Sequence, residues 1–123
     1  MSNADTALRY MNFVKGEAPR TAEADFTFVD WDELAELVDT KNFVRVERHG
    51  EAMDWLQTVA LMHRNIGSPK TYGLRGATEV GDRVFLELEE TIIHRGERMV
   101  FDSIYIFTFN GAGKVTRLEF FMH

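Results

Sequence analysis

Cysteine is absent from this 123-residue chain, which excludes disulfides, thiolate metal sites and cysteine nucleophiles. Basic residues are outnumbered, because 14 lysines and arginines stand against 20 aspartates and glutamates and leave a net charge of −6. A negative surface is repelled by phosphate groups. We therefore expect neither nucleic acid nor a membrane as a partner.

Long hydrophobic runs are also missing. No apolar run approaches the roughly 20 residues that cross a bilayer, and the N-terminus lacks the basic and then apolar segments of a secretory signal. The sequence contains no glycine-rich nucleotide loop and no metal-ligand spacing of histidines and carboxylates. These absences predict a cytoplasmic protein without a metal ion or a cofactor.

Bulky apolar residues are abundant. Hydrophobic residues make up 45% of the chain and include ten phenylalanines and two tryptophans, which is enough for a substantial core. The length is typical of one domain, so we predict that residues 1–123 fold as a single unit.

The first half of the chain has the 3.6-residue period of helices. A first helix is predicted over residues 5–15, ending near Gly16 and Pro19. Asp30 is a candidate N-cap for a second helix, a short strand is predicted at 42–48, and a third helix follows over 51–64. The inward faces of the first and third helices collect Tyr10, Met11, Val14, Trp55, Val59 and His63.

From residue 71 the period changes to two, which is typical of strands. We predict strands at 71–80, 83–94, 98–109 and 114–122, joined by short glycine-containing turns. Strands this long in a small domain must bend. The sequence therefore predicts an α+β fold in which three N-terminal helices pack in a strongly curved, mostly antiparallel sheet.

Strand alternation sorts the side chains of the long strands into two faces. The core side of the sheet is predicted to hold Leu88, Glu90, Phe101, Ser103, Tyr105, Leu118 and Phe120. The other face of strand 98–109 is also apolar, with Val100, Ile104 and Ile106 near its middle. Because the helices can cover only one face, we predict a homodimer through this second face.

The order of elements resembles the nuclear transport factor 2-like superfamily, an α+β cone that includes SnoaL-type polyketide cyclases, ketosteroid isomerases and limonene epoxide hydrolases. The segment FNGAGKV (Phe109–Val115) is similar to the final hairpin of the steroid isomerases. Arg9-Tyr10 falls where those isomerases keep an oxyanion-binding tyrosine. The resemblance covers nearly the whole chain as a pattern and implies a cofactor-free enzyme.

Applied to this chain, the resemblance implies a catalytic set with one departure. Tyr10 matches the tyrosine of the first helix, and Glu47 lies near the position of the acidic base, although a one-residue shift would put Arg48 there. Tyr105 stands where the isomerases have a protonated aspartate. The arginine and paired aspartates of the epoxide hydrolases have no counterpart at matching positions.

Glu90 is a candidate independent of the resemblance, because a carboxylate among leucines and isoleucines is costly to bury without a partner such as His63 or Arg45. We consider two functions. The first is proton transfer on a small apolar carbonyl compound, with Glu47 or Glu90 as base and Tyr10 and Tyr105 as oxyanion donors. The second is a non-catalytic module that binds a hydrophobic ligand or only dimerises. The expected ligand-binding residues are Val14, Trp55, Val59, His63, Leu88, Phe101, Ser103, Leu118 and Phe120.

Overall fold

A computed structural model of the chain describes residues 2–21, 31–47, 49–64 and 70–122. This part of the chain contains three helices and six strands. In chain order they are α1 (Asn3–Thr21), α2 (Trp31–Ala35), β1 (Val44–Val46), β2 (Ala52–Met53), α3 (Trp55–Arg64), β3 (Lys70–Val80), β4 (Arg83–His94), β5 (Glu97–Phe109) and β6 (Val115–Met122).

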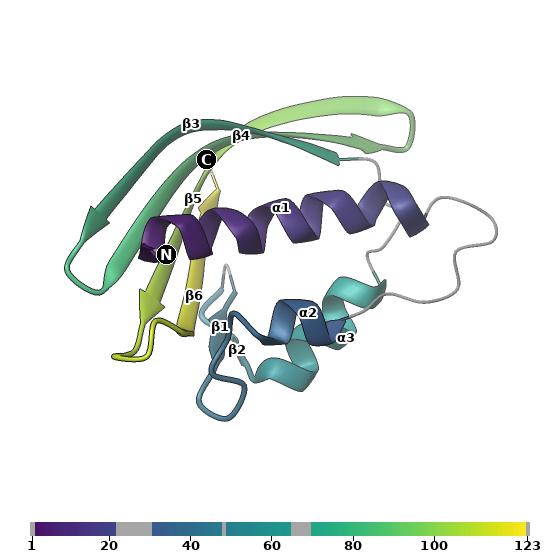
Figure 1. The fold of residues 1–123 in the computed structure, drawn as a ribbon. Helices are drawn as coiled ribbons and strands as arrows, with labels where there is room; N and C mark the ends of the chain where they lie inside the picture. Colours follow the sequence, from purple (N-terminus) through teal and green to yellow (C-terminus); the bar gives the residue numbers. More distant parts are fainter. Residues whose placement is uncertain (1, 22–30, 48, 65–69, 123) are drawn as a thin grey trace.

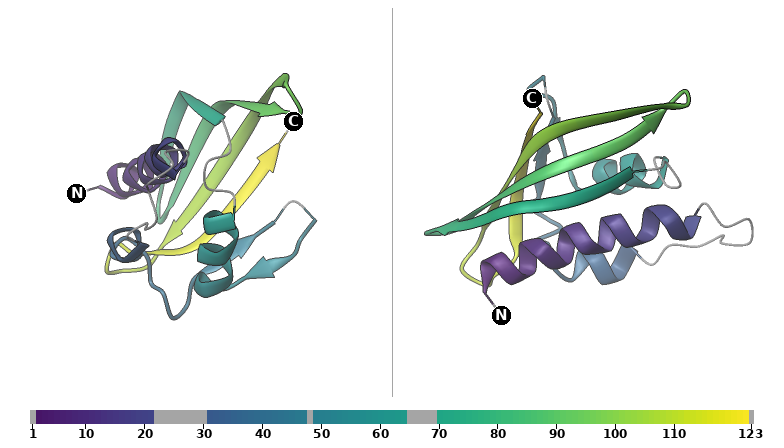
Figure 2. Two further views of the ribbon diagram at one scale, coloured as in Figure 1. Left: turned by 90° about the vertical axis from the view of Figure 1, so that its right-hand side faces the viewer. Right: turned by 90° about the horizontal axis from the view of Figure 1, so that it is seen from above.

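The strands form one curved sheet in the order β2-β1-β6-β5-β4-β3. Strand β1 runs parallel to β6, and the other neighbouring strands are antiparallel. Figures 1 and 2 show the sheet arching over the helices, with α1 along its β3–β4 side and α3 near β1 and β2. The predicted α+β cone is confirmed.

We call the side of the sheet that faces the helices the inner face, and the opposite side the outer face. Residues of the inner face alternate along the long strands and are mostly buried on β4, β5 and β6. Together with residues of the helices they form one core, whose largest fully buried side chains are Tyr10, Phe43, Phe107, Leu34, Leu86, Leu118, Val84 and Val115.

The long strands lie where alternation and turn residues predict them. Gly81, Gly96 and Gly113 have φ angles of 59°, 79° and 75°, a backbone conformation that glycine adopts without strain. These glycines lie in the turns between β3 and β4, between β4 and β5, and just before β6.

The predicted start of the third helix at residue 51 is wrong, because α3 begins at Trp55. Residues 52–53 instead form β2, which pairs with β1 after a turn closed by a Gly50 N–H to Glu47 carbonyl bond of 2.9 Å. Asp54 then caps the helix: its Oδ1 accepts from the Gln57 N–H at 2.8 Å, and Gln57 Oε1 accepts from the Asp54 N–H at 3.0 Å. This reciprocal capping box fixes where α3 can start.

The predicted end of the first helix is also wrong, since α1 continues through Gly16 and Pro19 to Thr21. Glycine lowers helix stability by only about 1 kcal/mol and so need not end a helix. The second helix is short and ends at Ala35. Its predicted cap, Asp30, lies outside the described residues.

The outer face of the sheet exposes apolar side chains. Val100 is 52% exposed and Ile104 41% exposed, while Ile106 is half-buried. Phe121 lies directly across from Ile104 in the β5–β6 register and is also exposed. Contiguous apolar surface of this kind is typical of an interface, so the homodimer through this face stays our proposal.

Replacing Ile104 with lysine is expected to convert a dimer into a monomer, because the charge would be buried at the centre of the proposed interface. Sedimentation or light scattering at micromolar concentration measures the change. Leu56→Lys is the matched control, since Leu56 is 78% exposed but lies on α3, away from the outer face of the sheet. A monomeric wild-type protein, or equal effects of the two substitutions, would contradict the proposal.

Candidate functional site

Six polar side chains of the inner face and of α1 lie together inside the cone, and we call them the inner cluster. They come from α1, β3, β4, β5, and the strand β1 with the residue that follows it. The inner cluster consists of Tyr10, Arg45, Glu47, Tyr72, Glu90 and Tyr105.

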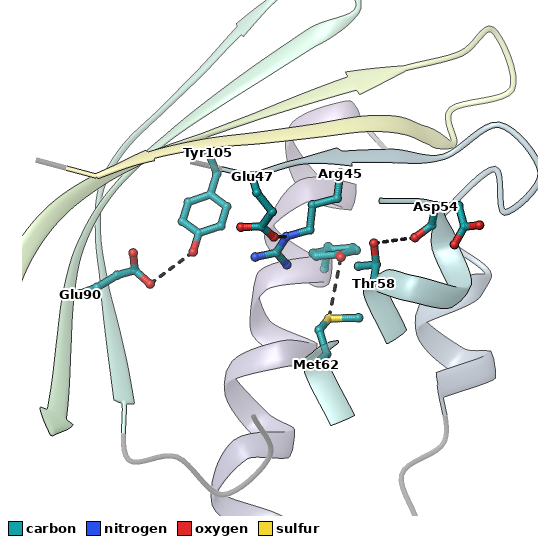
Figure 3. Close-up of polar contacts among 8 residues, drawn as sticks. Arg45, Glu47, Asp54, Thr58, Met62, Glu90 and Tyr105 are labelled. Atoms are coloured by element: carbon teal, nitrogen blue, oxygen red, sulfur yellow. Dashed lines mark hydrogen bonds and ion pairs between the residues drawn. The ribbon is translucent and has the colours of Figure 1, made fainter. Parts of the chain in front are cut away.

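Glu90 is a carboxylate in an apolar wall. Its side chain is only 5% exposed and shares the inner face of β4 with Leu88. The Tyr105 hydroxyl donates a hydrogen bond of 3.2 Å to Glu90 Oε1 (Figure 3). The expectation that His63 or Arg45 would pair with Glu90 is not met. A phenol from the neighbouring strand offsets part of the cost of burial instead.

Arg45 and Glu47 form an ion pair at the β1 side of the inner face (Figure 3). Arg45 Nε donates to Glu47 Oε1 at 2.7 Å, and the two side chains are 15% and 16% exposed. The Arg45 guanidinium lies 5.4 Å from the centroid of the Phe120 ring, which stacks on Tyr105 with centroids 5.7 Å apart. The side chain of Glu47 therefore faces the interior, as the base role requires. Its carboxylate, however, is paired with the Arg45 guanidinium.

The tyrosine hydroxyls are removed from water. Tyr10 donates a weak bond to the Met62 sulfur at 4.0 Å, and its ring packs edge-on against Phe107 at 5.4 Å. Burial raises the pKa of Tyr10 to about 12, while the positive charge of Arg45 acts in the opposite direction. Burial also raises the pKa values of Tyr72 and Tyr105; Glu90 adds to both shifts and Arg45 opposes both.

Ser103 is a buried polar residue with an unused hydroxyl. It lies on the inner face of β5, across from Leu88, and is 2% exposed. Among the described residues its Oγ has no hydrogen-bond partner. A hydroxyl in this state can serve a polar atom of a ligand at low cost.

The apolar residues expected to line the site are part of the core or border it. Trp55 is buried and packs edge-on against Phe43 at 5.3 Å, and Leu118 is buried beneath the sheet. The remaining expected residues include buried Leu88 and the partly buried Val14, Val59, Phe101 and Phe120. Their roles in binding stay predictions.

His63 does not face the inner cluster, so its predicted position on the inner face of the third helix is wrong. It is exposed and accepts a hydrogen bond of 3.4 Å from the Trp31 indole. The face of α3 that turns inward carries Trp55, Thr58 and Met62. The prediction failed because it followed the stripe through Trp55, Val59 and His63, whereas the buried stripe runs through Trp55, Thr58 and Met62.

A cavity of about 270 Å³ lies between α1 and strands β3 and β4. This volume is close to the lower end of the range for small-molecule sites. Tyr72 contributes to its wall, so the cavity adjoins the inner cluster at that residue. The cavity is lined by Leu8, Met11, Asn12, Tyr72, Leu74, Leu86 and Leu88.

Comparisons with known proteins identify the fold. No protein-family profile and no curated protein matches the chain. Among solved structures, an NTF2-like protein from Anabaena variabilis superimposes with a TM-score of 0.75 at 14% identity, covering 99% of this chain and 91% of the other. The chain has the nuclear transport factor 2-like fold.

Two further structures show how varied proteins of the nuclear transport factor 2-like fold are. A protein from Jannaschia sp. CCS1 described as SnoaL-like has a TM-score of 0.70 at 18% identity, covering 98% of this chain and 84% of its own. SalBIII, an epoxide hydrolase/cyclase-like enzyme with a role in pyran ring formation in salinomycin, has a TM-score of 0.75 at 13% identity. That match covers 98% of this chain and 90% of SalBIII. At such identities the similarity establishes the fold and not the activity.

Arg45 and Tyr72 are the two members of the inner cluster that were not predicted as site residues. Arg45 precedes Glu47 by two positions, so strand alternation puts it on the same face once Glu47 turns inward. Tyr72 pairs with Glu90 in the β3–β4 register. The turn sets the register of this hairpin, but a register shift between Leu74 and Gly76 lies between the turn and Tyr72, so counting from the turn misplaces Tyr72 by one residue and puts it on the wrong face.

The three tyrosines of the chain all belong to the inner cluster, which predicts an abnormal alkaline titration. The folded-state pKa of Tyr10, about 12, lies above the ordinary value of about 10. The corresponding stability is therefore complete below pH ~10 and is lost as the pH rises toward ~12. Tyr72 and Tyr105 shift in the same direction.

Absorbance of tyrosinate, followed together with circular dichroism, measures this titration. We expect no tyrosine to ionise near pH 10 while the protein is folded. In denaturant, as the control, all three should ionise near the ordinary value of about 10. A tyrosinate signal near pH 10 with a native circular dichroism spectrum would show that a tyrosine is not buried.

Removing the two predicted catalytic hydroxyls should affect stability unequally. Tyr105→Phe leaves the buried Glu90 carboxylate without its donor and is expected to reduce the free energy of unfolding by about 1–3 kcal/mol. Tyr10→Phe removes only a weak contact to a thioether and is expected to cost less than about 1 kcal/mol. Urea unfolding of both variants tests the contrast, and equal losses would contradict it.

Proposed function

We propose that this chain is a cofactor-independent enzyme that transfers protons on a small apolar carbonyl compound, as an isomerase, a lyase or a cyclase. The observation that carries the proposal is the buried hydrogen bond between Tyr105 and Glu90. A carboxylate that is 5% exposed and held by a neutral phenol retains its capacity to accept a proton. Glu47 is a weaker candidate base because it is already paired with Arg45.

Glu90 acts as the general base in this reaction. Its carboxylate takes a proton from a carbon next to the carbonyl, and the electron pair of the broken C–H bond moves to the carbonyl oxygen as an enolate. Return of the proton to another carbon gives isomerisation. Expulsion of a leaving group gives a lyase, and attack of the enolate carbon on a second carbonyl gives a cyclase.

Tyr105 both orients the base and can respond to its protonation. While Glu90 is ionised, the Tyr105 hydroxyl donates to it at 3.2 Å. Once Glu90 carries the proton it becomes a donor itself, which releases the phenol O–H toward an enolate oxygen. Tyr10 remains the second candidate oxyanion donor, since its bond to the Met62 sulfur is weak.

The alternative is a non-catalytic module that binds a hydrophobic ligand. The cavity between α1 and strands β3 and β4 supports it, because leucines and Met11 form most of its wall. Such a module would bind apolar molecules but would exchange none of their protons.

Hydrogen exchange separates the two functions without knowledge of the natural substrate. A set of small apolar ketones is incubated with the protein in D₂O, and exchange of the protons next to the carbonyl is followed by NMR. We expect catalysed exchange in the wild-type protein and at least a 100-fold loss in Glu90→Gln, the scale of a general base. Tyr105→Phe should retain part of the activity.

Glu87→Gln is the matched control, because Glu87 lies on the same strand but is exposed on the outer face. It should exchange protons as the wild-type protein does. Binding of the ketones without catalysed exchange would support the module, and unchanged exchange in Glu90→Gln would exclude Glu90 as the base.

A further inference from the structure

Arg45 places a guanidinium inside the cone that the proposed reaction has not yet used. An arginine side chain carries five N–H donors. The hydrogen bonds of Arg45 to described residues engage only Nε, which donates to Glu47 Oε1 at 2.7 Å. In the view of Figure 3 the guanidinium is drawn between Tyr105 and Met62, on the inner side of the sheet. An N–H donor without an acceptor costs free energy when the side chain that carries it is mostly buried, and the Arg45 side chain is only 15% exposed.

A second arginine–glutamate pair on the neighbouring strand shows what an ordinary structural pair looks like here. Arg117 Nε donates to Glu119 Oε1 at 3.0 Å, with the same two-residue spacing as Arg45 and Glu47. That pair is 47% and 22% exposed, whereas the inner pair is 15% and 16% exposed. Leu118, the residue between Arg117 and Glu119, pairs with Arg45 in the β1–β6 register.

Fold stability alone does not account for the inner pair, Arg45 and Glu47, at a buried position. A buried ion pair contributes little, and apolar residues of similar size would often stabilise a fold as well or better. The inner pair is therefore better explained by what its open donors can bind.

The charges of the inner cluster limit what can bind. Arg45 contributes one positive charge, and Glu47 and Glu90 contribute two negative charges. A further anion would meet two carboxylates, one of them unneutralised, and would be repelled. A neutral carbonyl oxygen accepts hydrogen bonds without adding charge. When Glu90 removes a proton, the negative charge moves from Glu90 to that oxygen and the total charge stays the same.

We propose that Arg45 donates to the carbonyl oxygen of the substrate and stabilises the oxyanion that forms there, and that Glu47 is the residue that positions it. The substrates are then neutral apolar ketones, esters or lactones rather than carboxylic acids. This inference rests on the proposed proton transfer and names the group that receives the charge. The positive charge of Arg45 also opposes the rise in pKa that burial gives all three tyrosines.

A hydroxynaphthalene tests the proposal, because it is flat and apolar, its ionised form resembles an enolate, and its fluorescence reports whether the hydroxyl is ionised. We expect neutral naphthol to bind and to pass its proton to Glu90, which leaves the total charge of the site unchanged, so that the bound ionised-to-neutral ratio in the wild-type protein exceeds that in water at the same pH. Arg45→Gln should lower the bound ratio about tenfold, one pKa unit. Arg45→Lys keeps the positive charge but lacks the planar set of N–H donors of a guanidinium. Its bound ratio should lie between those of the wild-type protein and Arg45→Gln.

Arg117→Gln is the matched control and should leave the ratio unchanged, since it breaks the equivalent pair on the outer face. Glu47→Gln and Glu47→Ala remove the same charge, but only Gln keeps an acceptor for Arg45 Nε. A higher bound ionised-to-neutral ratio in Glu47→Gln than in Glu47→Ala would therefore show that Glu47 positions Arg45. A purely structural role of Glu47 would not change this ratio. Circular dichroism and thermal unfolding establish that each variant is folded.

The proposal is overturned if the wild-type protein does not favour the naphtholate, or if folded Arg45→Gln and Arg45→Lys both keep the wild-type ratio. Glu90→Gln removes the carboxylate that would repel the anion, so this variant should still bind the ionised form and reports on the oxyanion position alone. Naphtholate binding without ketone exchange would thus reject the proton transfer and keep the oxyanion site. Ketone exchange without a preference for naphtholate would reject the oxyanion site and keep the proton transfer.

Discussion

Glu90, Arg45 and Glu47 lose most of their contact with water on the concave side of the sheet, and their partners follow from that loss. A buried charge needs an opposite charge or hydrogen bonds. Glu90 is bonded by the Tyr105 hydroxyl, and Arg45 is bonded by Glu47 and lies over the ring of Phe120. Phe120 in turn stacks on Tyr105, so the two polar groups are joined through one aromatic pair.

The curvature of the sheet makes this arrangement possible. Strands β4 and β5 provide Glu90 and Tyr105 from one side of the cone, while the short strand β1 provides Arg45 from the other. A flat sheet would hold β1 and β4 apart, because β6 and β5 lie between them. Only a strongly bent sheet turns the side chains of non-adjacent strands toward one another.

The sheet was predictable because its signals are local. Alternation of side chains over residues 83–122 predicts the strands, and glycines predict the short turns between them. Neither signal refers to the rest of the chain, and three of these glycines have positive φ angles in the structure. The start of α3 was not predictable by periodicity alone, since residues 52–53 complete a hairpin with β1 and only the Asp54–Gln57 capping box ends the ambiguity. The buried face of α3 was not predictable either, because polar Thr58 belongs to it and exposed His63 does not.

Alternation predicts which side chains of the candidate site face the core, but not which of them contact one another. Glu90 and Tyr105 could be placed inside from alternation, but their hydrogen bond depends on the β4–β5 register, in which Glu90 opposes Phe101 and Tyr105 opposes Leu86. Tyr72 depends on a further register across β3. Pairings between strands are set by turns and packing together, and the sequence of one strand does not contain them.

Two copies of the same Arg-x-Glu pattern show why residue type alone does not reveal function. Residues 45 and 47 and residues 117 and 119 form the same Nε–Oε1 bond on neighbouring strands. The outer pair is solvated, so its guanidinium can satisfy its remaining donors with water at little cost. The inner pair has little water and three phenols and a carboxylate near it, so its remaining donors favour an oxygen-bearing ligand. The difference arises from the face of the sheet on which each pair lies, and therefore from the fold.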